Sequence, residues 1–134
     1  MIVLDSSFLV AYLNTRDVHH PAAARAMVHL VAGEWGPAIL LEYVFLEVVT
    51  VLRARRGRAM ASDAAETLLA AREVEFMPCA DLFLEALATF RREDAALSFA
   101  DAAIVTVARR EKHGYVATFD TDFRKVQGVT MIPG

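Results

Sequence analysis

Cysteine is nearly absent from this sequence, with Cys79 the only one among 134 residues. An internal disulfide and a multi-cysteine zinc site are therefore excluded. Long apolar runs are missing too, because the longest, residues 43–52, contains Glu47 and falls well short of the ~20 residues that cross a bilayer. The first residues include no basic segment, and Asp5 interrupts their apolar stretch, so no secretory signal is expected. We expect a cytoplasmic protein without a membrane span.

An excess of positive charge is also missing. The formal net charge is −3, which argues against the broad positive field of a typical high-affinity nucleic-acid binder. Any polyanion would have to bind at local basic patches. No polar low-complexity stretch occurs, and the balance of 56% hydrophobic and 23% charged residues is that of a globular chain. The length predicts one domain over residues 1–134 with a core that needs no disulfides.

Short apolar segments alternate with longer amphipathic ones along the chain. Strands are predicted at residues 2–4, 38–40, 73–77, 115–118 and 129–132. Helices are predicted at 6–14, from Pro21 to about Gly33, at 41–56, after Ser62-Asp63, from Asp81 to about Arg92, at 98–112 and at 121–126. Because the strands are too apolar to have a wet face, this alternation predicts an α/β fold, a largely parallel sheet with helices on both sides. Sites in such folds form at the carboxyl ends of strands, where Asp5 and Asp120 are placed.

Four carboxylates lie in sequence surroundings too apolar to explain them: Asp5, Glu47, Asp101 and Asp120. An ionised carboxylate removed from water costs several kcal/mol unless it is paired, hydrogen-bonded or bound to a cation. Basic residues are scarce beside these four. We therefore hypothesise that folding gathers them around a divalent cation in a hydrolytic metal site.

Three of these acids also have a purely structural explanation as helix caps. Asp5 and Asp120 each precede a predicted helix, where an aspartate commonly accepts backbone N–H bonds. Asp101 follows Ser98 by three residues, which is the spacing of a capping box. Each acid taken alone is therefore compatible with a capping role.

Placement favours the metal site over these alternatives. Asp101 shares its helical face with Ile104 and Val105, the side expected to meet the sheet, and a cap does not require that face. Glu47 lies in the middle of a predicted helix, where no capping role exists. Its structural alternative is a buried salt bridge to one of Arg53, Arg55 and Arg56. The metal hypothesis explains all four acids together.

Four segments of the chain form a recognisable set. The chain opens with Ile-Val-Leu-Asp5-Ser-Ser-Phe-Leu-Val-Ala-Tyr-Leu and continues with Leu-Glu47-Val-Val-Thr-Val-Leu. It goes on with Leu-Ser-Phe-Ala-Asp101-Ala-Ala-Ile-Val-Thr-Val-Ala and ends with Ala-Thr118-Phe-Asp120-Thr-Asp122-Phe. In this order they resemble the PIN-domain nucleases, most closely the single-domain VapC toxins of bacterial and archaeal toxin–antitoxin pairs. The resemblance covers nearly the whole chain.

The resemblance implies a fold and an activity. The fold is a single PIN domain over residues 1–134, with a Rossmann-like three-layer arrangement of helices around a short, mostly parallel sheet. The activity is that of a Mg²⁺- or Mn²⁺-dependent endoribonuclease that hydrolyses RNA phosphodiester bonds. Its catalytic and metal-binding residues would be Asp5, Glu47, Asp101 and Asp120, with Asp122 as a further metal ligand and Ser6, Ser7 and Thr118 in support. Glu42 competes with Glu47, although the helix dipole alone would favour an acid near a helix start.

The resemblance also implies partners. These are an RNA substrate, a cognate VapB-like antitoxin that docks over the acidic cleft, and a second copy in a homodimer; the chain would be the toxin of a type II pair. Candidate RNA-binding cations are Arg53, Arg55, Arg56 and Arg109, although cations at helix C-termini also complement the backbone dipole. His19 and His20 are adjacent in a loop and point differently, which disfavours a two-histidine metal site.

Other functions remain open at this stage. A non-toxin PIN-domain nuclease in RNA processing would use the same site. A catalytically inactive protein-binding module would keep the acids as caps and ion pairs, but the presence of all four disfavours it. A phosphotransfer domain of receiver or haloacid-dehalogenase type is disfavoured because it needs an assisting lysine, and the only lysines are Lys112 and Lys125.

Overall fold

Five short strands form one parallel sheet through the middle of the chain. The computed structural model describes residues 1–134, and its strands are β1 (Ile2–Leu4), β2 (Ala38–Leu41), β3 (Val74–Met77), β4 (Tyr115–Ala117) and β5 (Thr130–Ile132). Their order across the sheet is β3-β2-β1-β4-β5, and every neighbouring pair is parallel. The predicted α/β fold with a parallel sheet is therefore confirmed.

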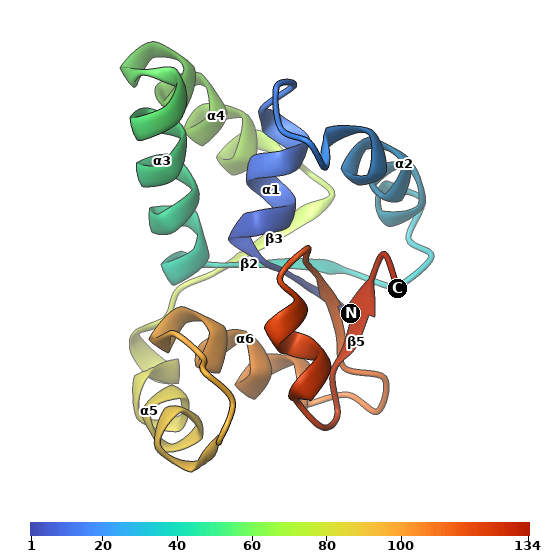
Figure 1. Cartoon of the computed structure of the whole chain (residues 1–134), viewed down its shortest axis with the longest axis vertical. Helices are drawn as coiled ribbons and strands as arrows, with labels where there is room; N and C mark the ends of the chain where they lie inside the picture. The colour runs from blue at the N-terminus through green and yellow to red at the C-terminus, as the bar shows by residue number, and fades with distance from the viewer.

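Helices cover both faces of this sheet (Figure 1). On one face lie α1 (Ser6–Leu13), α2 (His20–Val31), α3 (Glu42–Arg56) and α4 (Arg58–Ala70). On the other lie α5 (Phe83–Arg92) and α6 (Phe99–Ala108), with the short 3₁₀ turns η1 (Ala80–Leu82) and η2 (Thr121–Lys125). The crossover helices change face between the two halves of the sheet, so β1 and β4 are neighbours at the point where the strand order reverses. A crevice at the carboxyl ends of strands opens at such a point.

The central strands are buried on both faces, which explains their sequence. All residues of β1 and β2 are buried, whereas the edge strand β3 is half exposed. Burying one large aliphatic side chain contributes roughly 1.5–3 kcal/mol, so the apolar runs of β1 and β2 have a strong reason to occupy the interior. Leu4 of β1 pairs with Ala117 of β4, and this register brings Asp5 beside the residues that follow β4.

Three predicted helix boundaries are wrong. The fourth helix begins at Arg58, so Ser62 and Asp63 lie inside α4 and do not start it. Gly57, with a φ of 91°, ends α3 and begins α4 within one residue, and glycine reaches such a φ at no steric cost. The helix predicted to reach residue 112 ends at Ala108, because the polar residues 109–112 have no apolar face to bury. Asp81 lies within η1 and caps no helix.

Gly114 shapes the turn that leads into β4. Its φ is +54°, and a Cβ built there would lie 1.8 Å from the carbonyl oxygen of Gly128. The carbonyl oxygen of Gly114 accepts a hydrogen bond from Thr130 N at 2.8 Å. The turn before β4 and the turn before β5 therefore pack backbone against backbone, and only glycine fits. None of the helices combines the length and apolar composition needed to cross a bilayer.

Candidate active site

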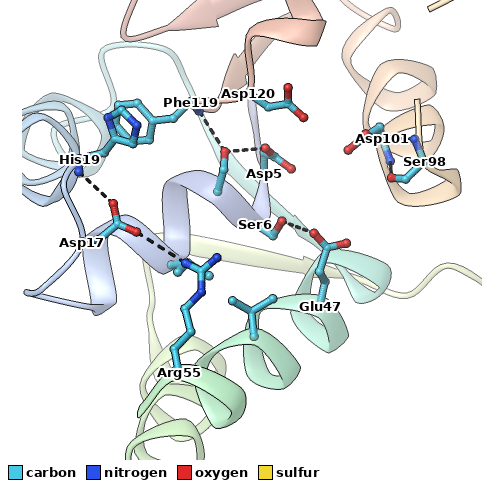
Figure 2. A pocket seen from close by; sticks show the side chains of 13 residues that line it. Asp5, Ser6, Asp17, His19, Glu47, Arg55, Ser98, Asp101, Phe119 and Asp120 are labelled. Atoms are coloured by element: carbon cyan, nitrogen blue, oxygen red, sulfur yellow. Dashed lines mark hydrogen bonds and ion pairs between the residues drawn. The ribbon is translucent and has the colours of Figure 1, made fainter. Parts of the chain in front are cut away.

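The four predicted acids line one pocket at the carboxyl ends of β1 and β4. Asp5 follows β1, Glu47 comes from α3, Asp101 from the first turn of α6, and Asp120 from the segment after β4 (Figure 2). The pocket has a volume of about 520 Å³. None of the ion pairs in the chain involves any of these four carboxylates. The structure thus brings together four acids from four separate segments and pairs none of them with a cationic side chain.

Asp5 is the most buried of the four acids, with only 4% of the residue exposed. Ser7 Oγ and Thr118 Oγ1 each donate a hydrogen bond to Asp5 Oδ2, both at 2.7 Å. Burial raises the pKa of Asp5, the two hydroxyl donors oppose that rise, and the charge of Glu47 adds to it. Asp5 precedes α1, but its side chain makes no capping hydrogen bond. The capping explanation for its side chain is therefore wrong.

Thr118 connects the two chain segments that carry Asp5 and Asp120. It is fully buried, and besides its bond to Asp5 its hydroxyl oxygen accepts Asp120 N at 2.9 Å. Ser7 Oγ lies 3.1 Å from Thr118 Oγ1 and accepts Phe119 N at 2.9 Å. Two hydroxyl side chains therefore hold Asp5 in one orientation and fix the backbone that positions Asp120. Ser7 and Thr118 thus lie beside the acids, and their supporting role stays a prediction.

Asp101 belongs to the capping box of α6 and Asp120 caps η2, and both also line the pocket. Asp101 and Ser98 form a complete capping box, with both hydrogen bonds at 3.1 Å. Asp120 Oδ1 accepts Asp122 N at 2.9 Å at the start of η2. Each cap uses one carboxylate oxygen, so Asp101 Oδ1 and Asp120 Oδ2 have no hydrogen-bond partner in the protein. Capping and pocket placement therefore coexist in these two residues.

Asp101 also shows that the acids act on one another electrostatically. Its pKa is raised to about 6, chiefly by burial, and the charges of Asp5 and Asp120 contribute to the rise while the bonds from Ser98 oppose it. Without a counter-ion, the negative charges of Asp5 and Asp120 therefore make the ionisation of Asp101 less favourable.

The raised pKa of Asp101 gives a prediction about stability. Because the folded chain holds this proton more tightly than an unfolded carboxyl of ordinary pKa 3.8, the free energy of unfolding should fall as the pH rises from about 4 to about 6. Asp101→Asn should reduce that dependence, to which the raised pKa of Asp5 also contributes, and raise the Tm of the metal-free protein at pH 7 by a few degrees, equivalent to about 1 kcal/mol after allowance for solvent screening of a partly exposed group. Thermal unfolding in chelator across pH 4–8 measures both effects.

The control for this measurement is Asp63→Asn, which changes an exposed acid on α4. It should leave the pH dependence as in the wild type. If Asp101→Asn shows the same pH dependence and the same Tm as this control, the ionisation of Asp101 does not destabilise the folded chain.

Glu47 is exposed and not buried as its apolar neighbours in the sequence suggested. Ser6 Oγ donates a hydrogen bond to its carboxylate, which turns it toward the pocket. The alternative of a buried salt bridge to Arg53, Arg55 or Arg56 is wrong. These arginines begin six residues further along α3, about 9 Å away along the helix axis, and two of them bind elsewhere. Arg55 pairs with Asp17 at 3.8 Å, and Arg56 donates to Asn14 Oδ1 at 2.6 Å.

The remaining predicted residues are placed more widely. Glu42 accepts Cys79 N at 2.9 Å and does not line the pocket, so Glu47 is the acid that α3 supplies. Asp122 does not line the pocket either. Arg55 lines it, whereas Arg53 is exposed on α3 outside it. Arg109 lies at the far end of α6, where it binds Glu93 and the carbonyl oxygen of Gln127. Its cation is therefore already engaged.

Sequence reasoning missed several residues of the pocket wall. Asp17, His19, Ser98 and Phe119 all line it. Ser98 was recognised only as a helix cap and His19 only as a poor metal ligand. Asp17 and His19 belong to a polar loop with no periodic pattern, so the sequence carries no signal for the face that they present.

The chemistry of the donors fits a hard divalent cation. Carboxylate and hydroxyl oxygens predominate in the pocket, and Mg²⁺ prefers such oxygens, keeps several waters and needs only one or two carboxylates. No three His, Cys, Asp or Glu side chains are placed to hold one ion together. The oxygen donors of this pocket are therefore of the kind that would hold such an ion.

Comparison with known proteins identifies the family. The family model of the PIN domain matches residues 2–129. The chain belongs to the PIN domain family. Among solved structures, this PIN domain is similar to VapC20 of Mycobacterium tuberculosis, described as a toxin that cleaves the sarcin–ricin loop. The two are 30% identical with a TM-score of 0.77, over 92% of this chain and 93% of that chain. The recognition of a VapC-type PIN domain is confirmed.

A second solved structure is similar in fold. VapBC2 from Rickettsia felis, solved with a DNA fragment from their promoter, has 13% identity and a TM-score of 0.68, over 98% of this PIN domain and 97% of that chain. A comparison with curated protein sequences found no match.

Proposed function

We propose that this VapC-type protein is a Mg²⁺- or Mn²⁺-dependent endoribonuclease, the toxin of a type II toxin–antitoxin pair, that acts as a single domain in the cytoplasm. One observation carries the proposal: four carboxylates from separate segments line one pocket and none has a cationic partner. Clustered acids without a counter-charge are costly, and a divalent cation relieves that cost while it attracts a phosphate. The similarity to VapC20, a sarcin–ricin loop cleaving toxin, supports RNA as the substrate.

The residues of the pocket would have different roles in hydrolysis. Asp5, Glu47, Asp101 and Asp120 would hold the ion, with Asp122 outside the wall in a supporting position. A bound divalent ion supplies positive charge that stabilises the phosphate as its bond is hydrolysed. Ser7 and Thr118 keep the Asp5 carboxylate in place whether or not the site is occupied. The free oxygens Asp101 Oδ1 and Asp120 Oδ2 are available to orient the attacking water.

The rim of the pocket offers a cation to the RNA backbone. Arg55 is exposed, lines the pocket and pairs with Asp17 at 3.8 Å, a distance at which a surface ion pair contributes little. Its guanidinium can therefore turn to a phosphate at small cost. Arg53 and Arg56 continue the positive charge along the end of α3. A local patch of this kind suits a chain with a negative net charge.

Two protein partners belong to the proposal. A VapB-like antitoxin would cover the acidic pocket, in keeping with the fold shared with a chain of the VapBC2 structure. A homodimer would use exposed apolar side chains outside the pocket, such as Phe76, Phe83 and Leu84. Large exposed apolar side chains are candidates for protein interfaces.

Metal removal tests the proposal. The wild-type protein should cut a pool of structured RNAs with Mg²⁺ or Mn²⁺, and excess chelator should reduce the rate by at least about 100-fold because the unpaired acids would repel the phosphate. Adding Mn²⁺ back should restore cleavage. Cleaved products separated by gel electrophoresis measure the rate. Equal cleavage in chelator would contradict the metal dependence, and no cleavage of any RNA would contradict the nuclease.

A further inference from the structure

The pocket has an aromatic wall in addition to its acids. Figure 2 shows His19 and Phe119 on one side of Asp5, with Asp101 and Glu47 on the other. Neither ring has a place in the proposed ion chemistry. A function for this wall must therefore involve another part of the substrate.

Three rings are stacked in a row from the core to this wall. The ring centroids of Phe8 and Phe119 are 5.9 Å apart with an interplanar angle of 16°. Those of Phe119 and His19 are 4.5 Å apart with an angle of 7°. Phe8 is fully buried, Phe119 is half-buried and His19 is exposed. The stack therefore ends at the pocket with an exposed imidazole whose inner face rests on an anchored ring.

The loop that carries His19 is held in place although it is polar. Asp17 Oδ1 accepts His19 N at 2.8 Å, and Asp17 N donates to Asn14 O at 2.9 Å. Arg56, at the end of α3, donates a hydrogen bond to Asn14 Oδ1 at 2.6 Å. These contacts fix the backbone below His19, so its ring is presented in a defined position.

The aromatic wall is also tied to the acids. Phe119 N donates to Ser7 Oγ, and Ser7 Oγ donates to Asp5 Oδ2, at 2.9 and 2.7 Å. A group that rests on His19 is therefore positioned relative to Asp5 by two hydrogen bonds and a ring stack. This coupling is what a substrate-positioning wall requires.

We propose that His19, supported by Phe119, is a stacking platform for an unpaired base of the RNA beside the bond that is cut. The inference rests on the proposed nuclease function. The acids and Arg55 address phosphate groups, which leaves the flat face of a base as the substrate group that a stacked ring recognises. Every base has such a face, so the platform positions the strand without reading its sequence. His19 is thus a positioning residue.

Matched variants separate stacking from other roles of a histidine. His19→Ala removes the ring, whereas His19→Phe keeps a flat ring and removes the titratable nitrogens. The control is His113→Ala, because His113 is also an exposed histidine stacked on an aromatic ring, Tyr115, at 5.2 Å and 13°, outside the pocket. Thr130 contacts only the backbone carbonyl of His113, so this control keeps that bond.

The kinetic test uses a cleaved RNA from the metal experiment. Stacking of one base on an aromatic ring corresponds to roughly a 5- to 100-fold change in binding. His19→Ala should raise KM by about that factor and change kcat less, and His19→Phe should restore KM to within about threefold of the wild type. His113→Ala should cleave like the wild type. A His19→Phe variant as impaired as His19→Ala would overturn the platform, since His19 would then act through its proton or charge.

The binding test needs no cleavage. Oligonucleotides of the same RNA carry 2-aminopurine at successive positions, and the protein is added with Mg²⁺ in an Asp5→Asn background, in which cleavage should be too slow to interfere. Fluorescence should be quenched at one position beside the cut bond, and His19→Ala should abolish the quenching while His19→Phe preserves it. Quenching that survives in His19→Ala, or quenching at no position, would overturn the platform even if the protein cuts RNA. A protein that cuts no RNA would instead contradict the proposed function.

Discussion

Asp5→Asn is expected to reduce RNA cleavage by roughly 10³-fold and to leave the fold intact. The substitution removes the charge of the most buried acid in the pocket, whose residue is 4% exposed. An amide can still accept hydrogen bonds from Ser7 and Thr118, so the local geometry should persist. The cost of burying a charge disappears, since burial raises the pKa of Asp5. The metal-free variant should therefore be at least as stable as the wild type.

Initial cleavage rates in Mg²⁺ and Mn²⁺, together with a thermal unfolding curve, measure this prediction. The control is Asp81→Asn in η1, an exposed acid outside the pocket, which should cleave at the wild-type rate. If Asp5→Asn folds and cuts RNA as fast as the control, the assignment of the active site to this pocket is wrong. Separate loss of stability would show instead that the Asp5 charge supports the fold.

Gly114→Ala is expected to destabilise the protein by more than about 3 kcal/mol. The new Cβ would lie 1.8 Å from the carbonyl oxygen of Gly128, at a φ of +54°. Neither backbone can move away easily, because Gly114 O accepts Thr130 N and β4 pairs with β5. A loss of this size corresponds to a fall in Tm of roughly 10 °C or more for a chain of this length. Denaturant unfolding at 25 °C gives the free energy directly.

Gly33→Ala is the control that separates the steric clash with Gly128 from the cost of a positive φ. Gly33 also has a positive φ, +79°, but a Cβ there would meet nothing within 4 Å. Its replacement should cost only about 1–2 kcal/mol, the penalty of a left-handed conformation for alanine. Similar losses in both variants would mean that the turn at Gly114 relaxes and that its packing against Gly128 is unimportant.

The sequence predicted the sheet well because burial dominates there. Residues 2–4 are predicted as a strand and form β1. All three are buried, so burial in the sheet accounts for their apolar character. The pattern around Gly57 was harder, because a single glycine both ends α3 and begins α4. Ser62 and Asp63 resemble helix N-caps in the sequence, although they lie inside α4. Local propensity cannot separate a cap from a polar residue inside a helix.

The candidate site was predictable where an acid follows a strand and less so elsewhere. The carboxyl ends of β1 and β4 brought Asp5 and Asp120 to one pocket as the topology required. Glu47 was placed correctly on α3, but its exposure was not foreseen, because periodicity identifies a helix face and not what covers it. The loop with Asp17 and His19 has no such pattern because its position depends on contacts with distant segments, such as the hydrogen bond from Arg56 to Asn14. Such contacts between distant segments leave no local pattern.

The bond between Thr118 and Asp5 joins positions 113 apart in the chain. The hydroxyl of Thr118 can reach Asp5 only once β4 has paired with β1, since Leu4 and Ala117 are partners in that pairing. Contacts between segments so distant in the chain form only when the intervening elements have folded. The orientation of the most buried acid is therefore a product of sheet assembly, which no short stretch of this chain could reproduce by itself.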